Sequence, residues 1–212
     1  LSFSGCPPAL YFDIEKLGCS DWIGQSLEYL KAEQSIKNVL VGFRYSSFLF
    51  GGQTNDYPNL PNEIPTMEYT ELAKKDEKVA NPREIYWASL SAIIEQLLSA
   101  GKQVYLLYPI PELPAHISKL ATPFSIFNKE PLVNLQETTS QQYYLERNAY
   151  ILEKLDSLPQ HANLIAIKPF DALCSSNHCP AAIDGQALYF DDNHLSLIGA
   201  KRLLGMSSII RQ

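Results

Sequence analysis

Residues 81–110 decide the fold class, and they read NPREIYWASLSAIIEQLLSAGKQVYLLYPI. The first two thirds of this stretch have apolar residues at helical spacing. Asn81 is suited to cap a helix, Pro82 to open it and Gly101 to end it in a left-handed conformation. The apolar run 103–110 that follows is typical of a strand buried on both faces. The stretch therefore predicts a capped helix leading into a buried strand.

The same alternation continues along the chain. Apolar runs predict strands, and helical periodicity predicts helices, at these positions: strands at 38–41, 103–110 and 163–170, and helices at 21–31, 82–100, 141–155 and 197–211. Such alternation predicts a three-layer α/β/α sandwich with a parallel sheet, whose functional sites lie at the carboxyl ends of the strands. Glu112 is expected at that edge as a loop carboxylate. The polar segments 51–78 and 114–140 are expected to run over the surface.

The composition predicts one globular domain over residues 1–212. Hydrophobic residues make up 46% of the 212 and charged residues 19%, which is incompatible with a disordered chain. The net charge of -6 argues against nucleic acid as a partner, because affinity for phosphate backbones depends on clustered Lys and Arg. No apolar run reaches the roughly 20 residues of a membrane-spanning helix.

The four cysteines fall into two local pairs, Cys6 with Cys19 and Cys174 with Cys179. This pattern favours two short disulfide loops in an oxidising compartment. The alternative is a zinc site using Cys174, His178 and Cys179. The usual zinc-binding turn has two residues between its cysteines, whereas this sequence has four. We therefore predict disulfides and no metal site.

The candidate chemistry lies in residues 189–196, YFDDNHLS, just before the last predicted helix. Asp191 precedes His194 by three residues, so its carboxylate can bind the imidazole Nδ1–H. That contact fixes the tautomer and stabilises the imidazolium formed when Nε2 takes up a proton. The spacing alone also fits an acidic turn that caps a helix.

Several further motifs carry a family resemblance, and together they cover nearly the whole chain. They are Ser4-Gly5-Cys6-Pro7-Pro8, residues 39–45, Tyr108-Pro109-Ile110-Pro111-Glu112, residues 171–179 and, most specifically, residues 188–200. With them the sequence resembles the SGNH domains that are fused to acyltransferase-3 membrane proteins. The resemblance implies an SGNH-hydrolase fold of the flavodoxin-like type.

The resemblance also implies roles for individual residues. Asp191 and His194 match the acid and base of the family's D-x-x-H block. Gly5 occupies the position of a glycine that donates to the oxyanion hole. Arg44 stands where the family's G-x-N-D block has asparagine, and Tyr45 where it has aspartate. Arg44 is then either a group that stabilises the oxyanion or binds an anionic part of the substrate, or a structural ion-pair partner at the strand end.

The family's nucleophile is the serine of a G-D-S block after its first strand. No G-D-S occurs in these 212 residues. We therefore expect the serine and the first strand upstream of Leu1, and the chain to be the C-terminal part of a larger membrane protein. Without that central strand, its two neighbours would have unpaired backbone groups.

The resemblance implies a serine-dependent acyltransferase or esterase, in the periplasmic domain of an inner-membrane protein. Its partners would be an acyl donor, a carbohydrate acceptor of the cell envelope such as O-antigen, and an upstream transmembrane acyltransferase domain. It implies no metal and no organic cofactor. The alternative is a non-catalytic glycan-binding or accessory domain that retains the fold, which the missing serine block and Arg44 favour.

Overall fold

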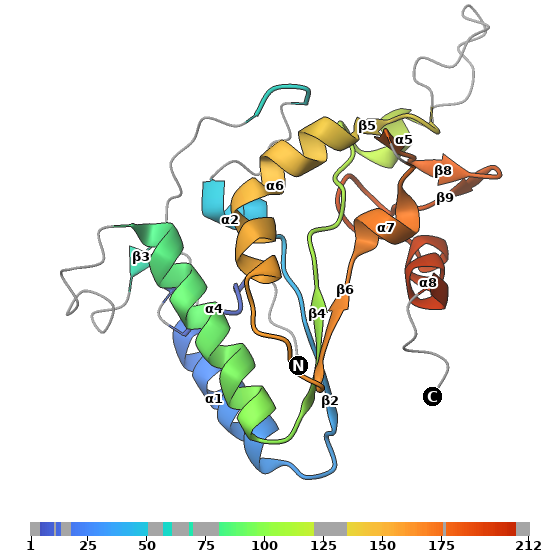
Figure 1. Cartoon of the computed structure of the whole chain (residues 1–212). Helices are drawn as coiled ribbons and strands as arrows, with labels where there is room; N and C mark the ends of the chain where they lie inside the picture. Colours follow the sequence, from blue (N-terminus) through green and yellow to red (C-terminus); the bar gives the residue numbers. More distant parts are fainter. Residues whose placement is uncertain are drawn as a thin grey trace, which may run out of the picture. The chain divides into compact units, whose positions relative to one another are not determined.

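Three short strands form a parallel sheet, β2 (Asn38–Val41), β4 (Gln103–Leu107) and β6 (Leu164–Ile167), in the order β2-β4-β6 (Figure 1). In the central strand, Val104 lies opposite Val39 on one side and Leu164 on the other. Val104 and Leu106 are buried, whereas Gln103, Tyr105 and Leu107 are partly exposed, so one face of the strand is fully covered rather than both as predicted. The α/β class and the parallel sheet predicted from the sequence are confirmed.

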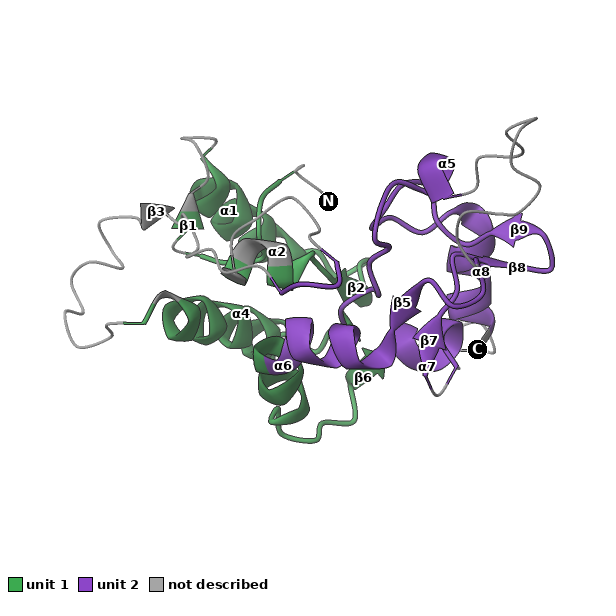
Figure 2. Cartoon of the chain, turned by 90° about the horizontal axis from the view of Figure 1, so that it is seen from above, with its two compact units in different colours: residues 1–52, 62–107, 150–167 green, residues 53–61, 108–149, 168–212 purple. Residues whose placement is uncertain are grey.

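The computed structural model describes residues 5–10, 12–13, 18–50, 57–60, 68–69, 81–120, 135–175 and 177–206. The chain divides into two compact units (Figure 2). The first unit comprises residues 1–52, 62–107 and 150–167, and the second comprises residues 53–61, 108–149 and 168–212. Most of the segment 51–78, residues 121–134 and the end of the last predicted helix lie outside the described residues. That the chain is a single domain stays a prediction.

Two strands end earlier than predicted, and a proline explains each ending. β4 stops at Leu107 rather than residue 110, and β6 stops at Ile167 rather than residue 170. Each strand ends two residues before a proline, Pro109 or Pro169, which has no N–H to donate to a neighbouring strand. Pro169 instead opens the short helix α7 (Pro169–Leu173).

Helix α4 (Pro82–Ser99) begins and ends as its sequence predicts. The Asn81 side chain accepts a hydrogen bond of 3.0 Å from the backbone N–H of Arg83. At the other end Gly101 has a φ of +74° and donates 2.9 Å to the carbonyl of Leu98. These contacts satisfy backbone groups that the helix leaves without partners.

Helix α1 (Cys19–Ala32) is tied to the start of β4 by a buried lysine. Lys102 donates from Nζ to the carbonyl oxygens of Glu33, at 2.7 Å, and Ile36, at 2.9 Å. The side chain thereby satisfies carbonyl groups just beyond the helix end, where a positive charge is favourable. α1 packs on α4, and α4 packs on β4.

The remaining elements of the first unit are short. β1 (Phe12–Asp13) pairs antiparallel with β3 (Glu68–Tyr69), and α2 (Tyr45–Phe50) follows β2. Helix α6 (Gln141–Asp156) begins in the second unit and ends in the first. In the first unit, Glu84 accepts hydrogen bonds from Lys154 at 2.9 Å and Tyr150 at 3.1 Å, which joins α4 to the end of α6.

Apart from the start of α6, the described part of the second unit has short helices and two-residue strands. They are α5 (Ile117–Leu120), β5 (Thr139–Ser140), α7, β7 (His178–Cys179), β8 (Ala182–Ile183), β9 (Gln186–Ala187) and α8 (Leu197–Met206). β8 and β9 form a hairpin around Asp184 and Gly185, whose φ angles are +50° and +74°. Asp-Gly is the sequence signal for a two-residue turn with both φ angles positive.

Both cysteine pairs form disulfides. Cys6 is joined to Cys19, and Cys174 is joined to Cys179. The second bond consumes two of the three ligands required by the alternative zinc site. Among the described residues, no three His, Cys, Asp or Glu side chains are arranged to hold a metal ion.

Candidate acid–base site

The candidate acid and base lie on a tight loop, residues 190–194. A bridge between Tyr189 and Leu195 closes the loop, and the Phe190 N–H donates 2.8 Å to the carbonyl of His194. Tyr189 is buried, with 2% of its surface exposed. The two ends of the loop are therefore held together, and the residues between them have little conformational freedom.

Asp191 and His194 contact each other within this loop. The Asp191 Oδ2 lies 2.7 Å from the imidazole Nδ1, and Oδ1 accepts 2.7 Å from the His194 backbone N–H and 2.8 Å from that of Asn193. Because a carboxylate only accepts hydrogen bonds, the contact places the proton on Nδ1 and leaves the Nε2 lone pair to accept one. This is the arrangement of an acid and a general base in a catalytic triad.

The charge of Asp191 is stabilised by its surroundings. Burial acts to raise the pKa of the carboxyl, but the hydrogen bonds from the backbone N–H groups of Asn193 and His194 and from the imidazole outweigh it. The pKa of Asp191 is therefore lowered from its usual value. The carboxylate stays charged throughout the neutral range and can stabilise an imidazolium.

The side chain of the candidate base, His194, is exposed, whereas that of the candidate acid, Asp191, is largely buried. The side chain of His194 is 72% exposed and that of Asp191 is 20% exposed. Two large apolar residues on either side in the sequence, Phe190 and Leu197, are 73% and 78% exposed. The imidazole can thus be reached by a group from outside this unit.

Helix α8 starts shortly after the loop and packs closely on Leu188, which lies just before the loop. Ser196 caps the helix, accepting 3.2 Å from the N–H of Gly199, and its own N–H donates 2.9 Å to the carbonyl of Leu188. A Cβ added at Gly199 would lie 2.1 Å from that same carbonyl oxygen. Only glycine allows α8 to approach Leu188, which lies just after β9, this closely.

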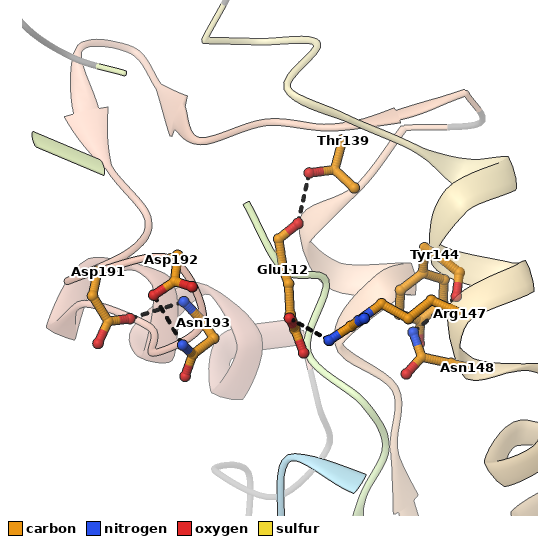
Figure 3. Close-up of polar contacts among 8 residues, drawn as sticks. All are labelled: Glu112, Thr139, Tyr144, Arg147, Asn148, Asp191, Asp192 and Asn193. Atoms are coloured by element: carbon orange, nitrogen blue, oxygen red, sulfur yellow. Dashed lines mark hydrogen bonds and ion pairs between the residues drawn. The ribbon is translucent and has the colours of Figure 1, made fainter. Parts of the chain in front are cut away.

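Residues 112–117 hold the loop by two backbone hydrogen bonds, and Figure 3 shows Glu112 of this segment pointing toward Arg147. The Leu113 N–H donates 2.7 Å to the carbonyl of Asp192, and the Ile117 N–H donates 3.2 Å to that of Asp191. Glu112 precedes Leu113 and forms a buried ion pair of 3.0 Å with Arg147 of α6. Sequence reasoning placed Glu112 on a loop but missed Arg147, which lies 35 residues away along the chain.

Gly5 and Arg44, the other two predicted site residues, belong to the first unit. Gly5 has a φ of +81°, next to the disulfide at Cys6, which accounts for glycine at this position. Arg44 follows β2, in a segment held against the end of β4. A Cβ at Gly42 would lie 2.9 Å from the side chain of Leu107, and the Tyr45 hydroxyl donates 3.1 Å to the Leu107 carbonyl.

Another histidine contact involves a serine but has a local explanation. The Ser118 hydroxyl lies 2.9 Å from Nδ1 of His116, and the Ser118 N–H donates 3.2 Å to the same atom. His116 immediately precedes α5, so the contact resembles a helix cap formed by an imidazole. A largely apolar cavity of about 300 Å³ lies in the first unit and shares no residue with the acid–base loop. It is lined by Ile94, Glu95, Leu98, Ser99, Leu158, Pro159, Gln160, His161 and Leu164.

In the part of the chain that the structure describes, no helix has the length and apolar character needed to cross a membrane. A search of curated proteins found no match. Among solved structures, the chain is similar to the periplasmic domain of a lipopolysaccharide acetyltransferase from Salmonella ser. Paratyphi A, with a TM-score of 0.61 and 17% sequence identity. The similarity covers 95% of this chain and 67% of that one, and it supports the fold. The family described as the SGNH domain fused to AT3 domains matches residues 1–206, and the chain belongs to this family.

Proposed function

We propose that this chain supplies the acid and the base of a serine-dependent acyltransferase or esterase. The observation that carries the proposal is the contact between Asp191 and His194, in which a charged carboxylate holds the imidazole by Nδ1 on a histidine side chain that is 72% exposed. Membership of the SGNH family supports it, because the two residues match the family's D-x-x-H block.

The proposed reaction has two acyl-transfer steps. A serine from outside these 212 residues attacks the carbonyl carbon of an acyl donor, and His194 Nε2 takes the hydroxyl proton. The tetrahedral intermediate collapses, the leaving group takes that proton, and the acyl group stays on the serine. A sugar hydroxyl or water then attacks the acyl-enzyme while His194 removes its proton, and the serine is released with its proton restored. Asp191 remains charged and stabilises the imidazolium in both steps.

The oxyanion formed in each step requires hydrogen-bond donors. We propose the backbone N–H of Gly5 as one donor, because Gly5 occupies the family's position for this group. Arg44 replaces the family's asparagine. Its guanidinium either stabilises the oxyanion or binds an anionic group of the substrate.

The proposed acceptor is a carbohydrate of the cell envelope, and the acyl group is acetyl or a related group. The solved structure most informative here belongs to a lipopolysaccharide acetyltransferase, and the described domain of that protein is periplasmic. Fusion to AT3 domains, which defines the family, supports a membrane acyltransferase domain as the partner that delivers the acyl group. The two disulfides suit the periplasm, which is oxidising.

The proposal is tested by acetyl transfer and acetylesterase assays on the intact protein. His194→Ala and Asp191→Asn should each lower kcat by about 10³-fold or more, because one removes the base and the other leaves it poorly oriented. His161→Ala is the matched control, since that exposed histidine lies in the first unit before β6 and should leave kcat unchanged. Wild-type rates in both site variants would contradict the proposal.

A non-catalytic glycan-binding or accessory domain is the second candidate. Arg44 and Tyr45 in place of the family's asparagine and aspartate favour it, as does the lack of a G-D-S block in these 212 residues. Such a domain would bind an acetylated polysaccharide without turnover. In that case His194→Ala would change neither binding nor the acetylation of the glycan.

A further inference from the structure

The loop that carries Asp191 and His194 is held by the main chain of a second segment. Two N–H groups, of Leu113 and Ile117, donate to the carbonyl oxygens of Asp192 and Asp191. A shift of residues 112–117 would therefore move the loop, since these bonds act on its backbone directly. The position of the acid depends on what fixes this segment.

Glu112 is the residue that fixes the segment most firmly. Its carboxylate pairs with the Arg147 guanidinium at 3.0 Å, and its carbonyl oxygen accepts 2.7 Å from the Thr139 hydroxyl. The next peptide N–H, that of Leu113, is the one that binds Asp192. Figure 3 shows the contacts of Glu112 with Arg147 and Thr139. Contacts on three sides thus meet at one residue, which is itself 7% exposed.

Helix α6 provides the rigid support for this arrangement. Arg147 is 5% exposed on α6, and one turn earlier the Tyr144 hydroxyl donates 3.1 Å to the carbonyl of Pro109. Tyr144 also stacks on Phe170, with ring centroids 4.8 Å apart. Residues 109–112, which lead into the segment, are therefore attached to α6 at two points, three residues apart on the same face of the helix.

The ion pair is poorly suited to stabilise the fold. Among the described residues, Nε and Nη1 of Arg147 are buried without a hydrogen-bond partner, so the guanidinium is only partly compensated for its loss of water. A buried ion pair of this kind often contributes no more stability than two apolar residues of similar volume. What it does contribute is a single defined position for the groups it joins.

The charge of Glu112 also affects Tyr189, the residue that immediately precedes the loop. The side chain of Tyr189 is buried and its hydroxyl has no hydrogen-bond partner among the described residues. Burial raises the pKa of Tyr189 well above its usual value, and the negative charge of Glu112 adds to the rise. The side chain of Tyr189 therefore stays neutral despite the nearby carboxylate, and its burial holds the start of the loop in place.

We propose that the Glu112–Arg147 ion pair positions the Asp191–His194 loop, as a charged anchor between α6 and the segment beneath the acid. The inference rests on the proposed function and adds two positioning residues to it. Neither residue is assigned contact with the substrate. Their effect on the reaction passes through Leu113, Asp192 and Asp191.

The test is a double replacement, Glu112→Met with Arg147→Met, in the intact protein. Because both charges are removed together, no unpaired buried charge remains, and the melting temperature should change by only a few degrees. The expected effect on acetyl transfer is a fall in kcat of about 10- to 100-fold with KM unchanged within about twofold, since a misplaced base loses rate and not binding.

A second readout does not depend on activity. In the wild type the hydrogen bond between Asp191 and His194 should give a low-field proton resonance for the imidazole Nδ1–H, and the double variant should lose or broaden it. If His194→Ala shows wild-type activity, the proposed function fails. The resonance then still decides whether the ion pair positions the loop.

The matched control is a second ion pair that joins two elements, Glu84 of α4 with Lys154 of α6 at 2.9 Å. Glu84→Gln with Lys154→Met should leave both kcat and the resonance unchanged, because this pair joins α4 and α6 in the first unit. Equal losses in the control would indicate general loosening and overturn the inference. So would a Glu112/Arg147 double variant with wild-type kcat and an intact resonance.

If the double variant does not fold, Thr139→Val replaces it. Valine keeps the shape of threonine but removes the donor to the Glu112 carbonyl. The expected result is a fall in kcat of about 3- to 10-fold at constant KM, with a broadened His194 resonance. A Thr139→Val protein that matches the wild type in both measurements would also overturn the inference.

Discussion

The carboxylate of Asp191 binds His194 at two points, the imidazole Nδ1 through Oδ2 and the backbone N–H through Oδ1, each at 2.7 Å. One residue therefore sets both the tautomer of the imidazole and the conformation of the main chain that carries it. An asparagine at position 191 could keep the backbone contact, but it would offer the imidazole a neutral partner. The two contacts can thus be separated by experiment.

Asp191→Asn should lower the free energy of unfolding by about 1 kcal/mol or less at neutral pH, because neutral hydrogen bonds replace charge-assisted ones at a partly exposed site. The pKa of Asp191 is lowered in the folded protein, so its contribution is present above the usual carboxyl pKa. This contribution to stability is lost as the pH falls through the lower pKa that Asp191 has in the folded protein. Urea unfolding of both proteins between pH 7 and pH 3 should show the difference shrinking below about pH 4. A difference that stays constant with pH would contradict the assignment.

Gly199→Ala should destabilise the protein by about 1–3 kcal/mol, because the new methyl group would meet the carbonyl of Leu188 at 2.1 Å. Helix α8 must then move away from Leu188, which lies between β9 and the acid–base loop. Gly205→Ala is the control on the same helix, where an added Cβ meets nothing within 4 Å. It should be neutral or stabilising by up to about 0.5 kcal/mol. Thermal unfolding measures both, and equal effects would mean that α8 does not pack as described.

Local features of the fold could be predicted from the sequence, and distant ones could not. Asn81 and Gly101 bound α4 as expected, because capping depends on the residues next to the helix end. The contact between Asp191 and His194 was predictable for the same reason, as three residues separate them. The pairing of Glu112 with Arg147 depends on how α6 packs, and neither residue carries a local signal for it.

Some errors could have been avoided with signals already in the sequence. Two of the three predicted strands ran past a proline, Pro109 or Pro169, although proline cannot donate to a sheet. The hairpin of β8 and β9 was not predicted, although Asp184-Gly185 is a strong turn signal. The strand errors affect segments that lead from the sheet into the second unit, and the missed hairpin lies within that unit, as do the candidate acid and base.

Arg44→Met should lower kcat/KM by about 10- to 100-fold while the melting temperature stays within a few degrees of the wild type. Methionine keeps the apolar length of the side chain and removes the charge and the donors. A fall in kcat would indicate a role at the oxyanion, and a rise in KM would indicate binding of an anionic group of the substrate. A structural ion pair would instead show a lower melting temperature with unchanged kcat/KM, which would contradict a role in the reaction.

The central claim is that His194 is the general base for a serine nucleophile, and labelling of the intact protein by a fluorophosphonate tests it most directly. This reagent reacts with activated serines, so we predict one labelled serine, identified by mass spectrometry, in a G-D-S sequence. Labelling should be lost in His194→Ala and kept in His161→Ala. A protein that is not labelled, or is labelled equally in the wild type and His194→Ala, would contradict the account.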